Sequence, residues 1–327
     1  MKKLFDRMVN IFRGVKGNIV SFLQTLFYNS VCKGWIELFG KHDKRTMKYS
    51  VSLCLIFKNE APFLKEWLDY HLTVGVDHFY LYNNNSDDDF MRVLKPYIDG
   101  NIVTFIEWPY DHSQFKAYKH CYENYRNETN WISFLDADEF FVPKNVDTIG
   151  EWLKDFDKYP AIVIHWKMFG TGGQLKHDSS KNVIEQYFTC WDHFYHLGKC
   201  FINTRYDIAD YNIWHVHHHT YMSYPIFGIK MTLPAVNQFG YICLVNHRIW
   251  GAPQNGYGKA TMFCNHYYTK AWDIYSKKMK RSDVLFVDAP RSKMNQFFKM
   301  ENYCTYRDYL ISRLYIKMKI KQGIIKI

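Results

Sequence analysis

The stretch 51-VSLCLIFKNEAPFLKEWLDYHLTVGVDHFYLYNNNSDDD-89 decides the fold of this chain. Residues 51–57 form an unbroken apolar run, which is typical of a strand buried on both faces of a parallel sheet. A helix with one apolar face follows, with Pro62 near its start and Gly75 at its end. A second strand is predicted at 77–82, so the stretch reads as strand, helix, strand.

The same alternation continues along the chain. The pattern predicts two more helices and two more strands, at 90–97, 113–126, 102–108 and 131–135. Strands that alternate with helices at this spacing form βαβ units, so we expect an α/β fold in one main domain, with a mostly parallel open sheet and helices on both faces. Beyond residue 143 the pattern loosens, although 161–167 still predicts a strand.

Polar residues follow three of the predicted strands, at 58–60, 83–89 and 136–139. Ligands of open α/β sheets bind outside the carboxyl ends of the strands, so these clusters predict one binding edge. Neither G-x-G-x-x-G nor G-x-x-x-x-G-K-[ST] occurs in the sequence. The usual dinucleotide and P-loop fingerprints are therefore excluded.

Asp136 and Asp138 directly follow the strand predicted at 131–135, with Glu139 beside them. Carboxylates this close repel one another unless a cation neutralises them, and Mg²⁺ or Mn²⁺ takes oxygen ligands from one or two carboxylates and from substrate phosphates. The pair therefore predicts a metal site that stabilises a departing diphosphate. The alternative is an acidic loop in which Asp138 or Glu139 caps a following helix.

Four blocks of the sequence resemble glycosyltransferases of families 2 and 92, which have the GT-A fold. The blocks are LIFKNEAPFLKEWLDYHLTVGVDHFYLYNNNSDDD, WISFLDADEFFVP, HWKMFGTGG and NHYYTKAWDIYSKKMKR, which occur in the family's order between 51 and 281. The resemblance implies a nucleotide-diphosphate-sugar donor, most often a UDP-sugar. It also implies a divalent metal, Mn²⁺ or Mg²⁺, held by the aspartate motif.

The resemblance also assigns roles to single residues. It places the metal at Asp136 and Asp138, and it includes His266, which is able to be a third metal ligand or to donate to a phosphate. It places the donor at two strand ends and in the closing block, which also contains Tyr267, at Asn59, Glu60, Asn85, Asp88, Lys270 and Arg281. Arg281 is followed by Ser282 where the family has glycine, so we expect a different turn there.

Several of these residues have a plainer interpretation. Asn59 is able to cap the following helix, Asp88 to hold a turn, and His266 to be a core histidine. Residues 277–280 also fit a solvated basic helix, so Arg281 is the preferred partner for the diphosphate. No motif identifies the base that deprotonates the acceptor hydroxyl, and the candidates are Asp178, Glu185 and Asp192.

These observations predict a hexosyltransferase that is assisted by a metal. It moves a sugar from a nucleotide-diphosphate sugar, with a UDP-hexose preferred, to a glycan or lipid-linked glycan in surface polysaccharide synthesis. Two alternatives stay open: a catalytically inactive carbohydrate-binding protein of the same fold, and a nucleotidyltransferase. The missing Gly-rich phosphate loop argues against the latter.

The formal charge of +10 is concentrated at the two ends of the chain. Residues 1–48 hold ten lysines and arginines against three acids, and 305–327 hold six against one. This distribution speaks against nucleic acid as a partner and favours an anionic membrane surface, with solvated tails as the alternative. We expect three parts: a basic amphipathic segment at 1–48, a GT-A domain at 49–285 and a basic helical tail at 286–327.

The apolar stretch near the N-terminus is interrupted by polar residues and falls short of the roughly 20 apolar residues that a membrane span needs. Eight cysteines show no CxxC pair and no regular spacing, which is typical of reduced, buried thiols. We therefore expect a cytoplasmic protein held peripherally on the inner membrane face.

A histidine cluster stands apart from these motifs. His215, His217 and His219 would share one face of a strand and are able to form a zinc site. A single histidine of this cluster lining the acceptor cleft is the preferred interpretation.

Overall fold

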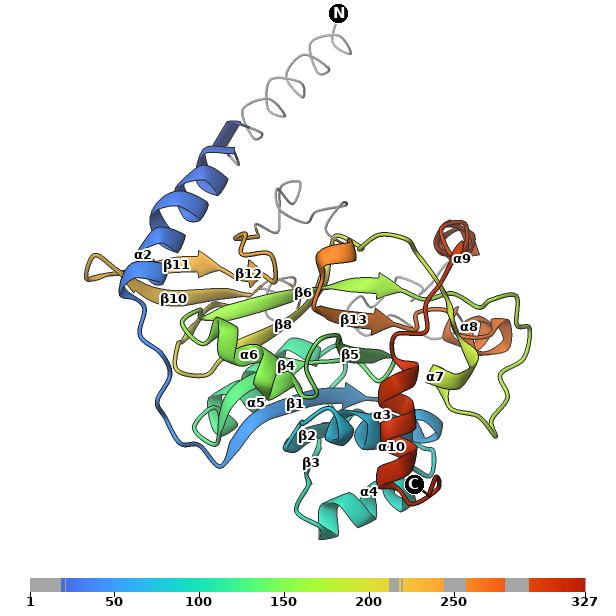
Figure 1. The fold of residues 1–327 in the computed structure, drawn as a ribbon. Coiled ribbons are helices and arrows are strands. Elements are labelled where there is room, and N and C mark those ends of the chain that lie inside the picture. The colour runs from blue at the N-terminus through green and yellow to red at the C-terminus, as the bar shows by residue number, and fades with distance from the viewer. Residues whose placement is uncertain are drawn as a thin grey trace, which may run out of the picture.

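The computed structural model describes most of the chain, and Figure 1 shows its fold. The described residues are 19–20, 22–211, 218, 220–243, 257–279 and 294–326. Within them, nine strands form one sheet in the order β3-β2-β1-β4-β8-β6-β13-β5, with β12 beside β6. The predicted α/β fold is confirmed.

The first half of the sheet is entirely parallel. Its strands and helices are β1 (Tyr49–Phe57), α3 (Ala61–Thr73), β2 (His78–Asn83), α4 (Phe90–Asp99), β3 (Val103–Glu107), α5 (Gln114–Tyr125) and β4 (Thr129–Phe134). Each strand predicted here is present, with its ends shifted by one or two residues. Pro62 lies in the first turn of α3, and Gly75 follows the end of this helix with a φ of 87° that favours glycine.

The second half of the sheet is mixed. It contains β5 (Glu139–Pro143), β6 (Ala161–Met168), β8 (Gly198–Asn203), β12 (Val236–Asn237) and β13 (Met262–His266). Strand β8 runs antiparallel between β4 and β6, and β5 runs antiparallel to β13. Because β8 lies beside β4, residues near 199 reach the end of β4 where the aspartates lie.

The sheet curls between β4 and β5. These two strands are joined by residues 135–138 alone, yet β8, β6 and β13 lie between them in the sheet order. Four strand spacings in a flat sheet are about 19 Å, which exceeds the reach of so short a link, at most about 18 Å fully extended. The curvature brings β5 back toward β4, and the link that carries both aspartates lies at this closure.

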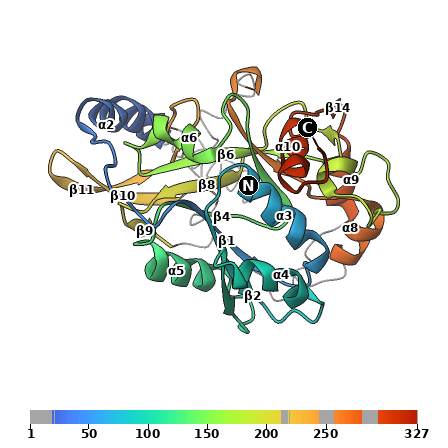
Figure 2. The same cartoon turned by 60° about the horizontal axis from the view of Figure 1, so that its bottom comes forward.

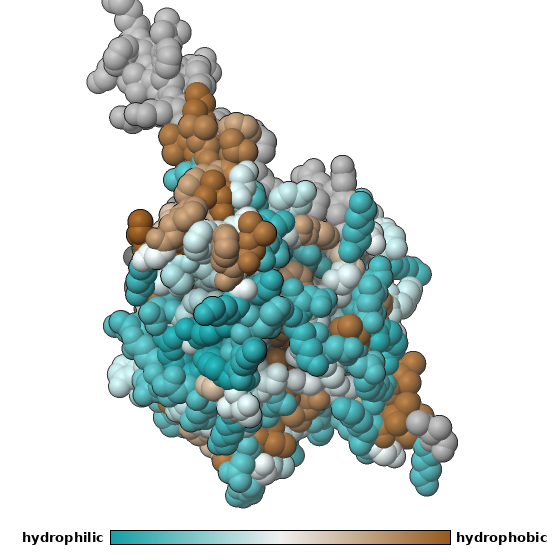
Figure 3. All heavy atoms as spheres, turned by 60° about the vertical axis from the view of Figure 1, so that its left-hand side comes forward, coloured by the Kyte–Doolittle hydropathy of each residue, from teal (hydrophilic) through white to brown (hydrophobic). Residues whose placement is uncertain are grey.

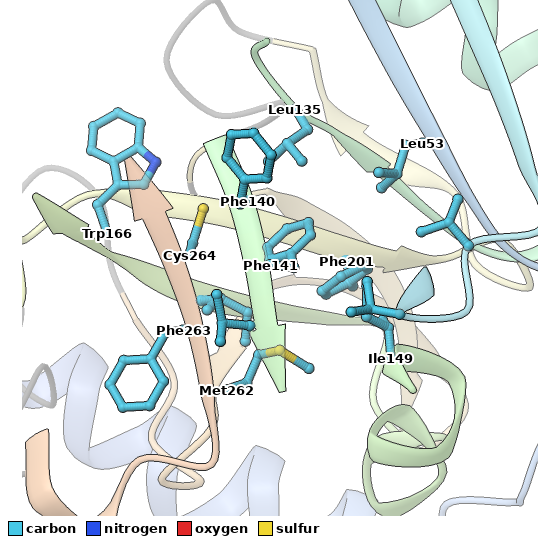
Figure 4. Packing of buried hydrophobic residues seen from close by; sticks show 14 of the residues in the cluster. Leu53, Leu135, Phe140, Phe141, Ile149, Trp166, Phe201, Met262, Phe263 and Cys264 are labelled. Carbon is cyan, nitrogen blue, oxygen red and sulfur yellow. The ribbon is translucent and has the colours of Figure 1, made fainter. Parts of the chain in front are cut away.

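Two hydrophobic cores cover the two faces of the sheet. Successive residues of a strand point to opposite faces, so Leu53 of β1 packs in one core with Trp67 of α3. Cys54 lies in the other core with Tyr118 of α5. Figure 4 shows the first core near β5, where the rings of Phe141 and Phe201 lie 4.3 Å apart between their centroids. Helices therefore lie on both faces, as predicted.

The remaining elements surround this sheet. They are a π-helical turn (Tyr28–Cys32), α2 (Lys33–Phe39), α6 (Ile149–Leu153), two 3₁₀ turns (Lys154–Phe156 and Tyr257–Lys259), α7 (Val183–Gln186), β7 (Thr189–Cys190), β9 (Ile208–Asp210), β10 (Tyr221–Ile226), β11 (Ile229–Pro234), α8 (Trp272–Met279), α9 (Met294–Glu301), β14 (Tyr306–Arg307) and α10 (Ser312–Lys321). Helix α10 packs on α3, as Figures 1 and 2 both show. Lys167 of β6 donates a hydrogen bond to Asp308, which ties the C-terminal segment to the sheet. The boundaries expected at 48 and 285 stay predictions.

The N-terminal helical segment, residues 19–20 and 22–39, is packed on the body of the protein at its second half, where Cys32 and Ile36 are buried, and its first turns extend away from the body (Figure 1). Among the residues that the structure describes, no helix combines the length and the apolar character that a membrane crossing requires. All eight cysteines are described; each is a free thiol, and only Cys304 is not fully buried.

Candidate active site

The loops after β1 and β2 are joined by hydrogen bonds. Asn59 accepts one from the Asp87 N–H at 2.9 Å and donates its own N–H to Ser86 Oγ at 3.0 Å. Asp88 Oδ2 accepts from the Ala61 N–H at the start of α3, at 2.8 Å. The side chain that serves the first turn of α3 is therefore Asp88, and the interpretation of Asn59 as the helix cap is wrong. The second oxygen of Asp88, Oδ1, is buried and has no hydrogen-bond partner within the described residues.

Glu60 and Asn85 lie in the same pair of loops. Glu60 is partly exposed at the position before α3, and Asn85 is exposed in a left-handed conformation with φ of 55°. Asn83, at the end of β2, donates to Glu107 at 2.8 Å and so fixes the neighbouring end of β3. The predicted donor residues of the first two strands thus share one edge of the sheet.

Asp136 is paired with a buried lysine. Lys199 Nζ lies 2.8 Å from Asp136 Oδ2 and 3.3 Å from Glu139 Oε2, and its side chain is 0% exposed. Burial raises the pKa of Asp136, but the charge of Lys199 outweighs it, so the pKa lies below its ordinary value. Asp136 is therefore an ionised carboxylate with a protein cation already beside it. No motif pointed to Lys199, which reaches the site because β8 pairs with β4.

Glu139 closes the turn that carries the aspartates. Its Oε2 accepts the Asp136 N–H at 3.0 Å, and its backbone begins β5. No helix follows the motif, so the alternative of Asp138 or Glu139 as a helix cap is wrong. Burial raises the pKa of Glu139 well above its ordinary value, and Lys199 offsets only part of this effect.

Asp138 is surrounded by three basic side chains. Its Oδ2 lies 2.8 Å from Lys278 Nζ and 3.8 Å from Lys270 Nζ, and its Oδ1 lies 3.5 Å from His266 Nε2. The backbone of Tyr267 donates to the Asp138 carbonyl at 2.8 Å. Burial raises the pKa of Asp138, but the two lysines, Lys278 foremost, hold it well below the ordinary value. Asp138 is thus ionised, with its two oxygens facing different partners.

His266 reaches Asp138 because β13 pairs with β5, which places His266 opposite Glu139. Burial lowers the pKa of His266, which favours the neutral imidazole that binds metals. Its ring also packs on Trp166, with centroids 4.7 Å apart. The residue is buried as a core histidine would be, but its Nε2 faces a carboxylate.

The geometry at Asp138 and His266 suits two ligands of one cation. Ligand atoms about 2.1 Å from a metal lie about 3 to 4 Å from each other, and the Asp138 and His266 atoms are 3.5 Å apart. Asp136 Oδ2 faces Lys199 at 2.8 Å, and the role of Asp136 as a metal ligand stays a prediction. In the part of the chain that the structure describes, no three His, Cys, Asp or Glu side chains form a metal-ligand group. A cation here would take Asp138 and His266 as ligands and fill most of its other positions with water and phosphate, as Mg²⁺ and Mn²⁺ do.

The basic residues of the closing block divide between the site and the surface. Lys270 is 5% exposed and lies over the ring of Phe63, 4.6 Å from its centroid. On α8, Lys277 is exposed but Lys278 points to Asp138, so the solvated interpretation of this basic stretch is wrong for Lys278. Arg281 lies outside the described residues.

His218, which lies between residues of the histidine cluster, is near Asp136. His218 Nδ1 is 2.9 Å from the Gly198 carbonyl, and its ring meets Trp166 edge to face with centroids 4.9 Å apart. Burial, followed by the charge of Lys199, lowers the pKa of His218 to about 3. His215, His217 and His219 lie outside the described residues, so the zinc interpretation stays a prediction.

The three candidates for the catalytic base have contacts of their own. Asp178 accepts from Ser180 and pairs with Lys181, and Glu185 accepts the Asn182 N–H in a capping box at the start of α7. Asp192 pairs with His193 at 2.6 Å. These contacts hold turns and a helix end, and the role of base stays a prediction for all three.

Fold and site together define an α/β protein with a candidate ligand site at the carboxyl edge of its sheet, where the acidic pair Asp136 and Asp138 lies beside Lys199, Lys270 and Lys278. The family model described as Glycosyltransferase family 92 matches residues 47–296. The chain belongs to glycosyltransferase family 92, one of the two families that its sequence resembles.

Two plant proteins are among its relatives. A glycosyltransferase family 92 protein of Oryza sativa subsp. japonica is 27% identical over 255 residues, which cover 76% of this chain and 38% of the relative. Galactan beta-1,4-galactosyltransferase GALS3 of Arabidopsis thaliana is 29% identical over 134 residues, which cover 37% of this chain and 27% of the relative. The chain thus spans less than half the length of these relatives.

Among solved structures, residues 1–349 of S. aureus TarS align with a TM-score of 0.31 and 14% identity, over 47% of each chain.

Proposed function

We propose that this glycosyltransferase moves a hexose from a UDP-sugar to a glycan or lipid-linked glycan acceptor in surface polysaccharide synthesis, assisted by Mn²⁺ or Mg²⁺. The observation that carries the proposal is the ionised Asp138 carboxylate, which faces His266 on one side and two lysines on the other. Such a site suits a divalent cation together with a diphosphate. Galactose is the first hexose to test, because the name of the relative GALS3 is that of a galactosyltransferase.

In this proposal, different residues at the sheet edge bind different parts of the donor. Asn59, Glu60 and Asn85, with the free oxygen of Asp88, offer acceptors and donors to a uracil edge and ribose hydroxyls. Lys270 meets the diphosphate, with Arg281 as the further partner that the resemblance implies. Asp136, held by Lys199, stays at the rim of the site as a fixed acceptor, 35% exposed.

The cation would be held by Asp138 and His266, with Asp136 as the third ligand that the resemblance implies; when bound, it neutralises charge that develops on the departing diphosphate. The lysines supply charge at the same place without any metal, because an ammonium group donates to phosphate oxygens directly. Asp178, Glu185 and Asp192 stay the candidates for accepting the proton of the acceptor hydroxyl. If one of them is the base, replacing it by an uncharged residue should abolish turnover and leave donor binding unchanged.

The test is release of UDP from a panel of UDP-hexoses in the presence of Mn²⁺. We expect Asp138→Ala to lose release by at least about 100-fold, since it removes charge stabilisation at the diphosphate. Asp155→Ala serves as the matched control, because Asp155 is exposed on a different part of the chain. Equal release by the wild type and Asp138→Ala would refute the metal-dependent assignment.

The same assay separates the two alternative functions. A catalytically inactive carbohydrate-binding protein releases no UDP from any donor but still binds sugar. A nucleotidyltransferase releases pyrophosphate or transfers the nucleotide.

We also propose an anionic membrane surface as a partner, with the protein peripheral on the cytoplasmic side. Exposed apolar side chains gather along the N-terminal helical segment (Figure 3), among them Ile19, Phe22, Leu23, Leu26, Leu38 and Phe39. They continue onto the β10–β11 hairpin, where the Phe227 ring contacts Trp35 with centroids 4.3 Å apart. Apolar side chains with lysines nearby suit the interface of anionic lipids.

Vesicle flotation tests this partner. We expect the full chain to float with vesicles of phosphatidylserine and phosphatidylcholine, more strongly than with phosphatidylcholine alone. Phe22→Ser combined with Leu26→Ser should reduce flotation, and Leu175→Ser, an exposed leucine of another loop, is the control. Unchanged flotation of the double variant would argue against this surface.

A further inference from the structure

The two oxygens of Asp138 are used differently. Oδ1 faces His266 Nε2 at 3.5 Å, which is the side that suits a cation. Oδ2 accepts a hydrogen bond from Lys278 at 2.8 Å and lies 3.8 Å from Lys270. One carboxylate therefore serves a metal position and a lysine pair at the same time.

Lys278 is firmly placed at this carboxylate. Its ammonium group also lies 3.3 Å from the Tyr268 carbonyl and 4.8 Å from the centroid of the Tyr268 ring. Its side chain is only 15% exposed, whereas the preceding residue of α8, Lys277, is exposed. The contact is thus a defined ion pair within the site and differs from the solvated lysine next to it.

We propose that Lys278 is the counter-ion of Asp138 when no donor is bound, so that the divalent cation and the nucleotide diphosphate bind as a coupled pair. The proposal rests on the proposed function, because it takes a metal and a nucleotide diphosphate as ligands. A dication beside Oδ1 and His266 lies close to two ammonium groups that share the same carboxylate, and like charges at such distances repel strongly in a buried site.

The diphosphate removes this repulsion. Its oxygens offer Lys278 and Lys270 new acceptors, and their negative charge lies between the lysines and the cation. Each ligand therefore strengthens the binding of the other, and the two effects must be equal because coupling free energies are reciprocal. Without Lys278, the cation would have less to displace and would bind well on its own.

The experiment is a titration of the full chain with Mn²⁺, followed by the electron paramagnetic resonance of free Mn²⁺, without and with saturating UDP. We expect UDP to strengthen Mn²⁺ binding to the wild type by about tenfold or more. Lys278→Met should bind Mn²⁺ alone about tenfold more tightly than the wild type, and UDP should strengthen its Mn²⁺ binding less than it does for the wild type, because phosphate oxygens still bind the cation but no longer relieve this lysine. Lys277→Met is the matched control on the same helix and should behave as the wild type.

Lys278→Arg keeps the charge and should retain the weak binding of Mn²⁺ alone, which separates the role of charge from any loss of folding in the methionine variant. If Lys278→Met and the wild type show the same Mn²⁺ affinity and the same coupling to UDP, the proposal for Lys278 is overturned while the proposed function stands. If the wild type binds no UDP at any Mn²⁺ concentration, the proposed donor itself is wrong. If Asp138→Ala binds Mn²⁺ as well as the wild type does, the metal lies elsewhere.

Discussion

Replacing Glu66 by glutamine should change how the stability of the protein depends on pH. Glu66 is a buried carboxylate of α3 that accepts the Val183 N–H at 2.7 Å and the Ile184 N–H at 2.9 Å. Burial raises its pKa from 4.5 to about 7; these two bonds and Lys270 lower it but do not compensate. Because the folded pKa lies above the ordinary value, this group's contribution to stability is full at low pH and is lost as pH rises through 7.

The magnitude follows from the two pKa values. The pKa of Glu66 shifts from 4.5 in the unfolded chain to about 7 in the folded protein. Between about pH 5 and pH 8, this shift lowers the unfolding free energy of the wild type by about 2.5 kcal/mol, compared with a protein that has a non-titrating residue at this position. Glutamine does not titrate, so the stability difference between the wild type and Glu66→Gln should move by this amount in favour of the variant as pH rises.

The assay is urea unfolding across this pH range, followed by both tryptophan fluorescence and circular dichroism, since a chain of this size need not unfold in two states. Glu123→Gln is the control, because Glu123 is an exposed carboxylate whose pair with Lys119 is worth less than about 1 kcal/mol at any pH. A difference between the wild type and Glu66→Gln that stays constant with pH would refute the reasoning that burial outweighs two backbone hydrogen bonds.

Three further substitutions test the buried framework of the site by urea unfolding. Lys199→Met should cost about 3 to 5 kcal/mol, because it removes the buried ammonium group that lies 2.8 Å from Asp136 and 3.3 Å from Glu139, and a cost under about 1 kcal/mol would contradict the buried pair. Gly198→Ala should destabilise the protein by about 2 kcal/mol or more, because the added Cβ would lie 2.1 Å from a backbone oxygen of β6; wild-type stability would show that β8 is placed differently. Asp308→Asn should cost about 3 kcal/mol by leaving the buried Lys167 without its carboxylate, and an unchanged midpoint would show that the C-terminal segment does not pair with β6.

The parallel half of the fold was predictable because its signals are local. Apolar runs such as 51–57 bury both faces of a central strand, and Gly75 and Pro62 mark the ends of α3 within their own neighbourhood. The mixed half was not, since β8 takes its place between β4 and β6 through pairing with strands tens of residues away. Nothing within GKCFIN at 198–203 states that its lysine will lie beside an aspartate.

The candidate site divides in the same way. The acidic pair and the polar strand ends were visible in the sequence as local clusters. His266 was predicted as a site residue because the closing block resembles the family. Lys278 was assigned to a solvated basic helix, because the sequence of a basic stretch does not show which side of the helix packs on the protein. The bond of Asp88 to the first turn of α3 could not be predicted, because it depends on the meeting of two loops.

The lysines also change the reason for expecting a metal at Asp136 and Asp138. Two carboxylates in one turn were expected to need a metal to stay ionised together, yet Lys199 and Lys278 each lie 2.8 Å from one of them and hold both pKa values below the ordinary range. The pair is therefore ionised before any cation arrives, and a metal is not required to keep the turn in shape. What a metal adds must then be sought in its effect on the diphosphate, which is why its affinity should be measured with and without UDP, and with and without Lys278.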